Sequence, residues 1–145
     1  MPGPVFTGVR SLFFGLLLVV VTGLSLSAQE PVPDKLVVLT FDDSSRSHYD
    51  VARPILKKYG FSATFFITEG FNFSTNKKDY MTWGQIAQLH KDGFEIGNHT
   101  RDHLGLNERN IAQLQEQLAG INLRCKQHGI PRPVSFAYPG NSFHP

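Results

Sequence analysis

The chain has 145 residues, of which 41% are hydrophobic and 18% are charged, and its formal net charge is +2. This composition fits one globular domain and not two, and it contains no low-complexity tract that would indicate disorder. The 14 lysine and arginine residues are scattered along the chain, which excludes the clustered basic face of a nucleic-acid-binding protein.

Residues 1–28 differ in composition from the rest of the chain. Arg10 precedes an apolar run from Leu12 to Val21, and small residues follow as far as Ala28. This pattern is typical of a secretory signal peptide cleaved near Ala28, and an N-terminal anchor that is retained is the alternative. We therefore expect a secreted, periplasmic or cell-envelope protein, which is membrane-anchored if the signal is not cleaved.

A proline-containing linker at 29–34 leads into the domain expected at 35–145. The run Lys35–Phe41 is apolar and rich in valine and leucine, which predicts a strand buried on both faces. Two adjacent carboxylates, Asp42 and Asp43, follow it directly. Because neighbouring carboxylates oppose each other's ionisation, a cation is their usual partner.

A helix and a second strand are expected next. Asp50 is a candidate N-cap for a helix that ends at Tyr59, where Gly60 stops it. The segment Phe61–Thr68 has the β-branched and aromatic residues of a buried strand.

The next helix has a recognisable beginning. Thr82 and Gln85 have the spacing of a capping box, and the helix that they begin is expected to run to about Lys91 and to end at Gly93. Phe94–Asn98 is then expected to form a short third strand.

The longest expected helix begins at Asn107 as its N-cap and ends at Gly129. Its apolar residues recur at intervals of three and four, as in a helix: Ile111, Leu114, Leu118, Ile121 and Cys125. The only cysteine, Cys125, excludes an internal disulfide and is expected to be a small buried side chain. Val134–Ala137 is expected to form a fourth strand, followed by a turn at Tyr138–Gly140.

Strands that alternate with helices indicate an α/β fold in which parallel strands are joined by right-handed crossover helices. Four such strands make half a barrel or a small open sheet. In either case, side chains at the carboxyl ends of the strands gather at one edge.

Two histidines at that edge are candidate metal ligands. His99 and His103 follow the third strand and are four residues apart, so a helical turn or a tight loop can bring them together. Two imidazoles and one carboxylate from the end of the first strand make a tridentate site for zinc or another first-row divalent metal. By spacing alone, the pair also fits surface histidines.

Four segments resemble motifs of the polysaccharide deacetylases, the family with the NodB-homology domain. They are Thr40–Asp43, Ala63–Phe66, Phe94–His103 and Phe136–Gly140. Their order and spacing are similar to those of the family over about Lys35 to Asn141.

This resemblance implies the N-terminal portion of a (β/α) barrel that removes N-acetyl groups from amino-sugar polysaccharides with the help of a divalent metal. Asp42 would be the general base, and Asp43, His99 and His103 would bind the metal, which is expected to be Zn²⁺, with Co²⁺ or Ni²⁺ as alternatives. The backbone N–H of Gly140 would stabilise the oxyanion.

The substrate expected from the resemblance is a glycan such as peptidoglycan or a chitin-like polymer, which Tyr138 and Pro139 would contact. Further aromatic residues could stack on sugar rings, or pack within the core and loops: Phe71, Phe73, Tyr80 and Trp83.

The chain also departs from the family. Ser44 stands where the family usually has glycine, and Ala137 stands where many members have an arginine that tunes the base. Two later motifs, one with a histidine that acts as general acid, would lie beyond Pro145. His48 lies close after Asp43 and could join the site, but we expect it to be a solvated loop residue.

These departures leave a second hypothesis open, namely a non-catalytic or inactive carbohydrate-binding remnant that lacks the general acid. An iron oxygenase with two histidines and one carboxylate is disfavoured, because the carboxylate of such a site normally lies beside the first histidine, whereas Asp43 precedes His99 by 56 residues.

Overall fold

The computed structural model describes residue 32 and residues 34–141. The signal peptide or anchor expected at 1–28 lies outside this range. Residues from Lys35 onward form a compact unit of their own. None of the helices in the described part of the chain is both long and apolar enough to span a membrane.

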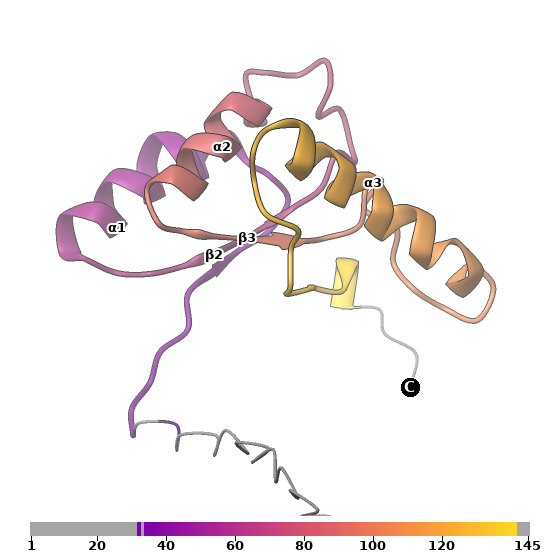
Figure 1. Ribbon diagram of the computed structural model, residues 1–145, viewed down its shortest axis with the longest axis horizontal. Helices are drawn as coiled ribbons and strands as arrows, with labels where there is room; N and C mark the ends of the chain where they lie inside the picture. Colours follow the sequence, from indigo (N-terminus) through magenta and orange to yellow (C-terminus); the bar gives the residue numbers. More distant parts are fainter. Residues whose placement is uncertain (1–31, 33, 142–145) are drawn as a thin grey trace, which may run out of the picture. The chain divides into compact units, whose positions relative to one another are not determined.

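The unit is built on a three-stranded parallel sheet. β1 (Thr40–Phe41) pairs with β2 (Thr64–Ile67), and β2 pairs with β3 (Glu95–Asn98). Figure 1 shows α1 (Arg53–Tyr59), α2 (Trp83–Lys91) and α3 (Leu114–Gln127) on one side of this sheet. The parallel pairing and the crossover helices agree with the sequence prediction.

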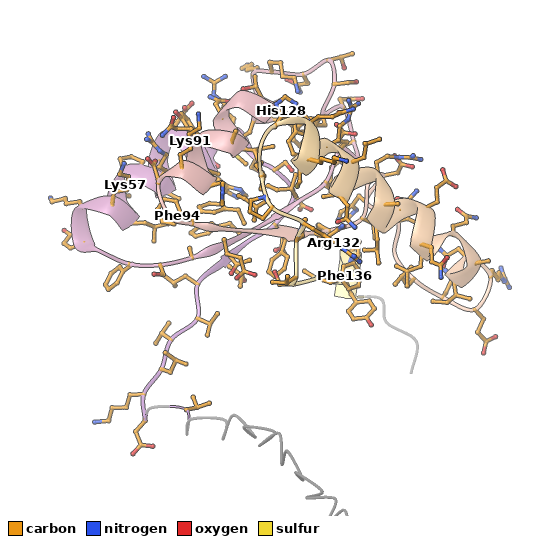
Figure 2. All side chains as sticks on the ribbon, in the orientation of Figure 1. Lys57, Lys91, Phe94, His128, Arg132 and Phe136 are labelled. Atoms are coloured by element: carbon orange, nitrogen blue, oxygen red, sulfur yellow. The ribbon has the colours of Figure 1, made fainter. Side chains whose placement is uncertain are left out.

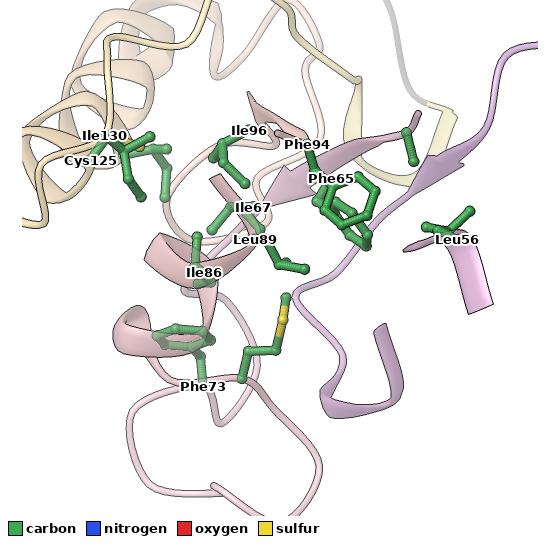
Figure 3. Close-up of a cluster of buried hydrophobic side chains, with 13 residues drawn as sticks. Leu56, Phe65, Ile67, Phe73, Ile86, Leu89, Phe94, Ile96, Cys125 and Ile130 are labelled. Carbon is green, nitrogen blue, oxygen red and sulfur yellow. The ribbon is translucent and has the colours of Figure 1, made fainter. Parts of the chain in front are cut away.

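The core lies between the sheet and the helices. On β2, Phe65 and Ile67 alternate with less buried residues, so one face of this strand points into the core. Figure 3 shows the buried side chains that surround them: Leu56, Ala63, Phe73, Met81, Ile86, Leu89, Phe94, Ile96, Ile121, Cys125 and Ile130. The prediction that Cys125 is a small buried side chain is confirmed.

The predicted strand Lys35–Phe41, buried on both faces, is wrong in extent and in burial. Only Thr40 and Phe41 are in a strand, while Leu36, Val37 and Val38 are 59%, 76% and 71% exposed. β1 is the edge strand of the sheet, and no described residues pair with its outer edge or cover these side chains. The second strand is also shorter than predicted, since Phe61 is exposed and pairing starts at Thr64.

The predicted N-cap roles of Asp50 and Asn107 are wrong. Helical backbone begins at Arg46, and Asp50 lies inside a π-helical turn, His48–Ala52, that precedes α1. The carboxylate of Asp50 pairs with Arg46 at 2.9 Å. Asn107 forms a separate turn by accepting a hydrogen bond from the backbone N–H of Arg109, and α3 begins only at Leu114.

Other predicted helix ends are confirmed. α2 begins with the capping box of Thr82 and Gln85 and extends to Lys91. Gly60 follows α1 with a φ of 69°, and Gly93 and Gly129 also have positive φ angles after their helices.

The fourth strand, predicted at Val134–Ala137, is reduced to one parallel bridge between Phe136 and Asn98. Phe136 is labelled in Figure 2. Pro133 has no N–H to donate, and Val134 is 94% exposed, so only the backbone next to Phe136 bonds to β3. This short pairing still places residues 137–140 beside the carboxyl end of β3. A short 3₁₀ turn, Pro139–Asn141, follows it.

Candidate metal centre

Three predicted ligands meet at the carboxyl ends of β1 and β3. Oδ1 of Asp43 lies 3.1 Å from Nε2 of His103 and 3.3 Å from Nε2 of His99. The three atoms that could serve as ligands lie within 4.8 Å of one another. One carboxylate and two imidazoles around a common point are a donor set that divalent transition metals bind.

Oδ1 of Asp43 supports this interpretation. The atom is buried and has no hydrogen-bond partner within the described residues, although the rest of the side chain reaches solvent. Most buried polar atoms in proteins are hydrogen-bonded, and an exception often marks the place of an ion. The two Nε2 atoms that face this oxygen make a cation the fitting partner, so the residues present suit a divalent metal.

His99 is held in the orientation that a ligand needs. Its ring is almost completely buried, and Nδ1 lies 2.9 Å from the backbone carbonyl oxygen of Ala137. An Nδ1–H that donates to this carbonyl leaves the lone pair on Nε2, which faces Asp43. Sequence reasoning missed this role of Ala137, because a backbone carbonyl leaves no signal in residue type.

The neighbours of His103 affect the pKa of its imidazole and restrict the space around its side chain. Burial lowers the pKa of its imidazole, and the charge of Asp43 opposes this effect. A lowered pKa favours the neutral ring, which is the form that binds a metal. His103 also packs against Gly70, where an added Cβ would lie 2.6 Å from the Cβ of His103, so that only glycine fits.

The loop between the two histidines is held by α3. Gln117 is buried, accepts a hydrogen bond from the backbone N–H of Asp102 at 2.8 Å, and donates another to the carboxylate of Asp102 at 2.8 Å. The hydrogen bond from Arg101 lowers the pKa of Asp102 and keeps it charged. The two hydrogen bonds of Gln117 could not be deduced from the motif, since Gln117 belongs to a separate helix.

Ser44 makes a specific contact in place of the glycine that the family usually has. It has a φ of 56° and is fully buried. Its Oγ donates a hydrogen bond to the carbonyl of Thr68 at 2.8 Å and accepts one from the N–H of Thr68 at 3.0 Å. This pair of bonds joins the residue after Asp43 to the end of β2, and it compensates for a backbone conformation that disfavours a side chain.

The other predicted site residues lie around this group. Asp42 is exposed after β1, and its charge acts on both His48 and His103. Pro139 is buried, Tyr138 is 46% exposed, and Gly140 has a φ of 62°. Their catalytic and substrate-binding roles stay predictions.

The expectation that His48 is a solvated loop residue is wrong. His48 begins the π-helical turn, and its ring packs at 5.3 Å from Phe41 and 6.0 Å from Phe65. Burial lowers the pKa of His48, while the charges of Asp43 and Asp42 oppose the shift. It is nevertheless not a member of the group of candidate ligands.

The fold is therefore α/β, with parallel strands and crossover helices, and an Asp–His–His group that could bind a metal ion lies at the carboxyl ends of the strands. The family model described as polysaccharide deacetylase matches residues 29–145. The chain therefore belongs to the polysaccharide deacetylase family, as its motifs predicted.

Two curated relatives are enzymes named for amino-sugar polymers. The chain is 28% identical over 111 residues to the peptidoglycan-N-acetylglucosamine deacetylase of Bacillus cereus, a match that covers 76% of this chain and 48% of that protein. It is 33% identical over 87 residues to the poly-beta-1,6-N-acetyl-D-glucosamine N-deacetylase of Staphylococcus aureus, over 58% of this chain and 30% of that protein.

A solved structure confirms the fold class, a partial (β/α) barrel. The Streptococcus pyogenes deacetylase PplD, in complex with acetate, matches with a TM-score of 0.67 and 30% identity, over 79% of this chain and 50% of that chain. The chain thus spans half or less of the length of these three proteins.

Proposed function

We propose that this chain carries the metal-binding part of a hydrolase that removes N-acetyl groups from an amino-sugar polysaccharide. The observation that supports this most directly is the meeting of Asp43, His99 and His103, with the buried Oδ1 of Asp43 facing the Nε2 atoms of both histidines. The names of the relatives support the substrate class, which is a polymer of N-acetylglucosamine, in peptidoglycan or as a free polysaccharide.

Each residue of the site has a separate proposed role in the reaction. Asp43, His99 and His103 hold the metal, for which we propose Zn²⁺. When bound, this ion would polarise the amide carbonyl and would lower the pKa of the water that it binds. Asp42, exposed beside the group, takes the proton of the attacking water. The backbone N–H of Gly140 donates to the oxyanion, and Tyr138 and Pro139 contact the sugar.

Metal binding by the purified chain tests the core of this proposal. We expect one Zn²⁺ per chain in a calorimetric titration, and a loss of binding of at least a hundredfold in Asp43→Ala and in His103→Ala. Asp79→Ala and His128→Ala are the matched controls, because neither residue belongs to the ligand group, and both should bind Zn²⁺ normally. Equal binding in all four variants would contradict the proposed centre.

Acetate release separates catalysis from binding alone. The metal-loaded chain is incubated with acetylated chito-oligosaccharides, and released acetate is measured enzymatically. If the unsubstituted chain releases acetate, and Asp42→Asn binds zinc but releases none, the result supports the hydrolase function and the role of Asp42. Zinc and oligosaccharide binding without any acetate release would favour the second hypothesis, a carbohydrate-binding remnant.

We also propose that residues 1–28 direct export and that the catalytic domain begins at residue 35. The composition of residues 1–28 supports the first part, and the compact unit from Lys35 supports the second. A fusion of residues 1–34 to a reporter that is active only outside the cytoplasm should give activity, and a fusion from which 1–28 are deleted should not.

A further inference from the structure

The residue before His99 is bonded to α3. Asn98, at the end of β3, is buried, and its Nδ2 donates hydrogen bonds to the backbone carbonyl of Leu118 at 3.1 Å and to Oδ1 of Asn122 at 3.3 Å. Its Oδ1 accepts a hydrogen bond from the backbone N–H of Thr100 at 3.0 Å. The side-chain amide of Asn98 therefore connects the turn that carries His99 to the middle of α3.

The residue before His103 is bonded to the same helix. Asp102 forms two hydrogen bonds with Gln117, which is buried. Between these two attachments, Arg101 packs on Gly120, where an added Cβ would lie 2.8 Å from Cδ of Arg101. One side of α3 thus contacts the loop next to both histidines.

The backbone of this loop has a conformation that its residue types do not favour. Thr100 and His103 have φ angles of 60° and 55°, in the left-handed region that favours glycine. Strained backbone of this kind persists where the surrounding structure imposes it. The bonds from α3 to Asn98 and Asp102 provide such a constraint, because they fix the loop at both of its ends.

We propose that Asn98 and Gln117 are positioning residues, which hold the two histidine ligands at the separation and angle that Zn²⁺ requires. This inference deepens the proposed function and rests on it. Both side chains act through the chain next to a ligand, Asn98 directly and Gln117 through Asp102. Loss of such supporting bonds weakens metal binding about ten- to a hundredfold. Because coupling between two sites is reciprocal, bound Zn²⁺ must also strengthen the docking of α3 on the loop.

An exchange of the two polar groups tests the role of Gln117, whose Nε2 donates to the carboxylate of Asp102. Gln117→Glu removes this donor and places two carboxylates together, so we expect the Kd for Zn²⁺ in a calorimetric titration to rise about tenfold or more. Asp102→Asn in the same chain supplies a donor from the other side, and this double variant should bind Zn²⁺ within about threefold of the unsubstituted chain. The double variant also loses the exposed ion pair of Asp102 with Arg101, which contributes little.

Gln115→Glu is the matched control. Gln115 lies in the same helix but is exposed, so this substitution adds the same charge and should leave the Kd for Zn²⁺ unchanged. The visible absorption bands of Co²⁺, bound in place of Zn²⁺, report the coordination geometry directly. These bands should shift in Gln117→Glu, return in the double variant and stay the same in Gln115→Glu. A role of Gln117 in stability alone would lower the free energy of unfolding and leave the bands and the Kd unchanged.

Hydrogen exchange of the unsubstituted chain tests the reciprocal effect without any variant. Zn²⁺ should slow amide exchange in α3 more than in α1, because α3 is bonded to the loop that carries both histidines. Equal slowing in the two helices, equal Zn²⁺ affinities in Gln117→Glu and Gln115→Glu, or a double variant that binds no better than Gln117→Glu would overturn the positioning role and leave the metal centre intact. No binding of Zn²⁺ by the unsubstituted chain would overturn the proposed function and this inference together.

Discussion

Ser44 illustrates how a single side chain stabilises the backbone of the candidate metal centre. Asp43 and Ser44 both have positive φ angles, 69° and 56°, so two consecutive residues adopt a conformation that favours glycine. The two hydrogen bonds between Ser44 and the backbone of Thr68 offset this cost. The family resemblance identified Ser44 as a departure, but only the contact with Thr68 explains it.

Two substitutions of Ser44 distinguish the contribution of its hydrogen bonds to stability from the cost of its backbone strain. Ser44→Ala loses both bonds and keeps the Cβ at a positive φ, and we expect it to lower the free energy of unfolding by about 2–3 kcal/mol. Ser44→Gly loses the same bonds, but glycine adopts a positive φ without steric strain. The glycine variant should therefore be about 1 kcal/mol more stable than Ser44→Ala. Urea denaturation measures both values, and an alanine variant as stable as the glycine variant would contradict this explanation.

A second prediction for a single residue concerns the substitution of Gly70. Gly70→Ala would force a Cβ to within 2.6 Å of the Cβ of His103, so the loop that carries this ligand must move. We expect the Kd for Zn²⁺ to rise at least tenfold, which fluorescence competition with a zinc-chelating dye can measure.

The control is Gly84→Ala. Gly84 lies in α2, where an added Cβ meets only the Thr82 hydroxyl oxygen at 3.8 Å. This substitution should leave zinc affinity unchanged and stabilise the helix by roughly 0.5–1 kcal/mol. Similar zinc affinities in the two alanine variants would show that Gly70 does not position His103.

At the scale of elements, the beginning of α2 could be predicted from the sequence and the beginning of α3 could not. The capping box of Thr82 and Gln85 is a local device, in which two residues of one turn satisfy each other's backbone groups, so the sequence reveals it. Asn107 has the right residue type for an N-cap, but its side chain bonds to Arg109 in a separate turn. Residue type alone does not distinguish these two uses of an asparagine.

The carboxylate of Asp92, whose side chain is 8% exposed, connects α1 to α2 and makes folding dependent on pH. The hydrogen bond from Arg53 lowers the pKa of Asp92 to about 2, with Lys57 and Gln88 adding further bonds. Since the carboxyl has its ordinary pKa near 3.8 in the unfolded chain, its contribution to stability is fully present above about pH 5. This contribution is lost as the pH falls toward 2.

We therefore expect Asp92→Asn to lower the free energy of unfolding at pH 7 by about 1–2 kcal/mol. The variant should also lose less stability than the unsubstituted protein between pH 5 and pH 2, because the titrating group is gone. Urea titrations at several pH values test this. Parallel pH profiles of the two proteins would contradict a role for Asp92.

At the scale of the whole unit, the most conspicuous feature is the outer edge of β1, with which none of the described residues pairs. Leu36, Val37 and Val38 precede this edge strand and are all more than half exposed. Exposed apolar residues beside an unpaired strand edge promote association with other chains.

We expect the chain to self-associate in a concentration-dependent manner, and Val37→Lys to reduce this association. Sedimentation velocity at several concentrations measures the effect. Val134→Lys is the control, since Val134 is even more exposed but lies outside the sheet edge. A chain that is monomeric throughout, or equal effects of both substitutions, would contradict this prediction.

The sequence alone determined the order of strands and helices, the family, and the residue types of the metal centre. Hydrophobic periodicity and short motifs carry this information, because they depend on residues that are near one another in the chain. Only the tertiary structure shows which strand residues are buried and that Ser44 bonds to Thr68. It also shows that a side chain at position 70 would clash with His103, and that the carbonyl of Ala137 orients His99. These features depend on backbone groups and close approaches between residues distant in the chain, and neither kind of contact is recorded in residue type or spacing.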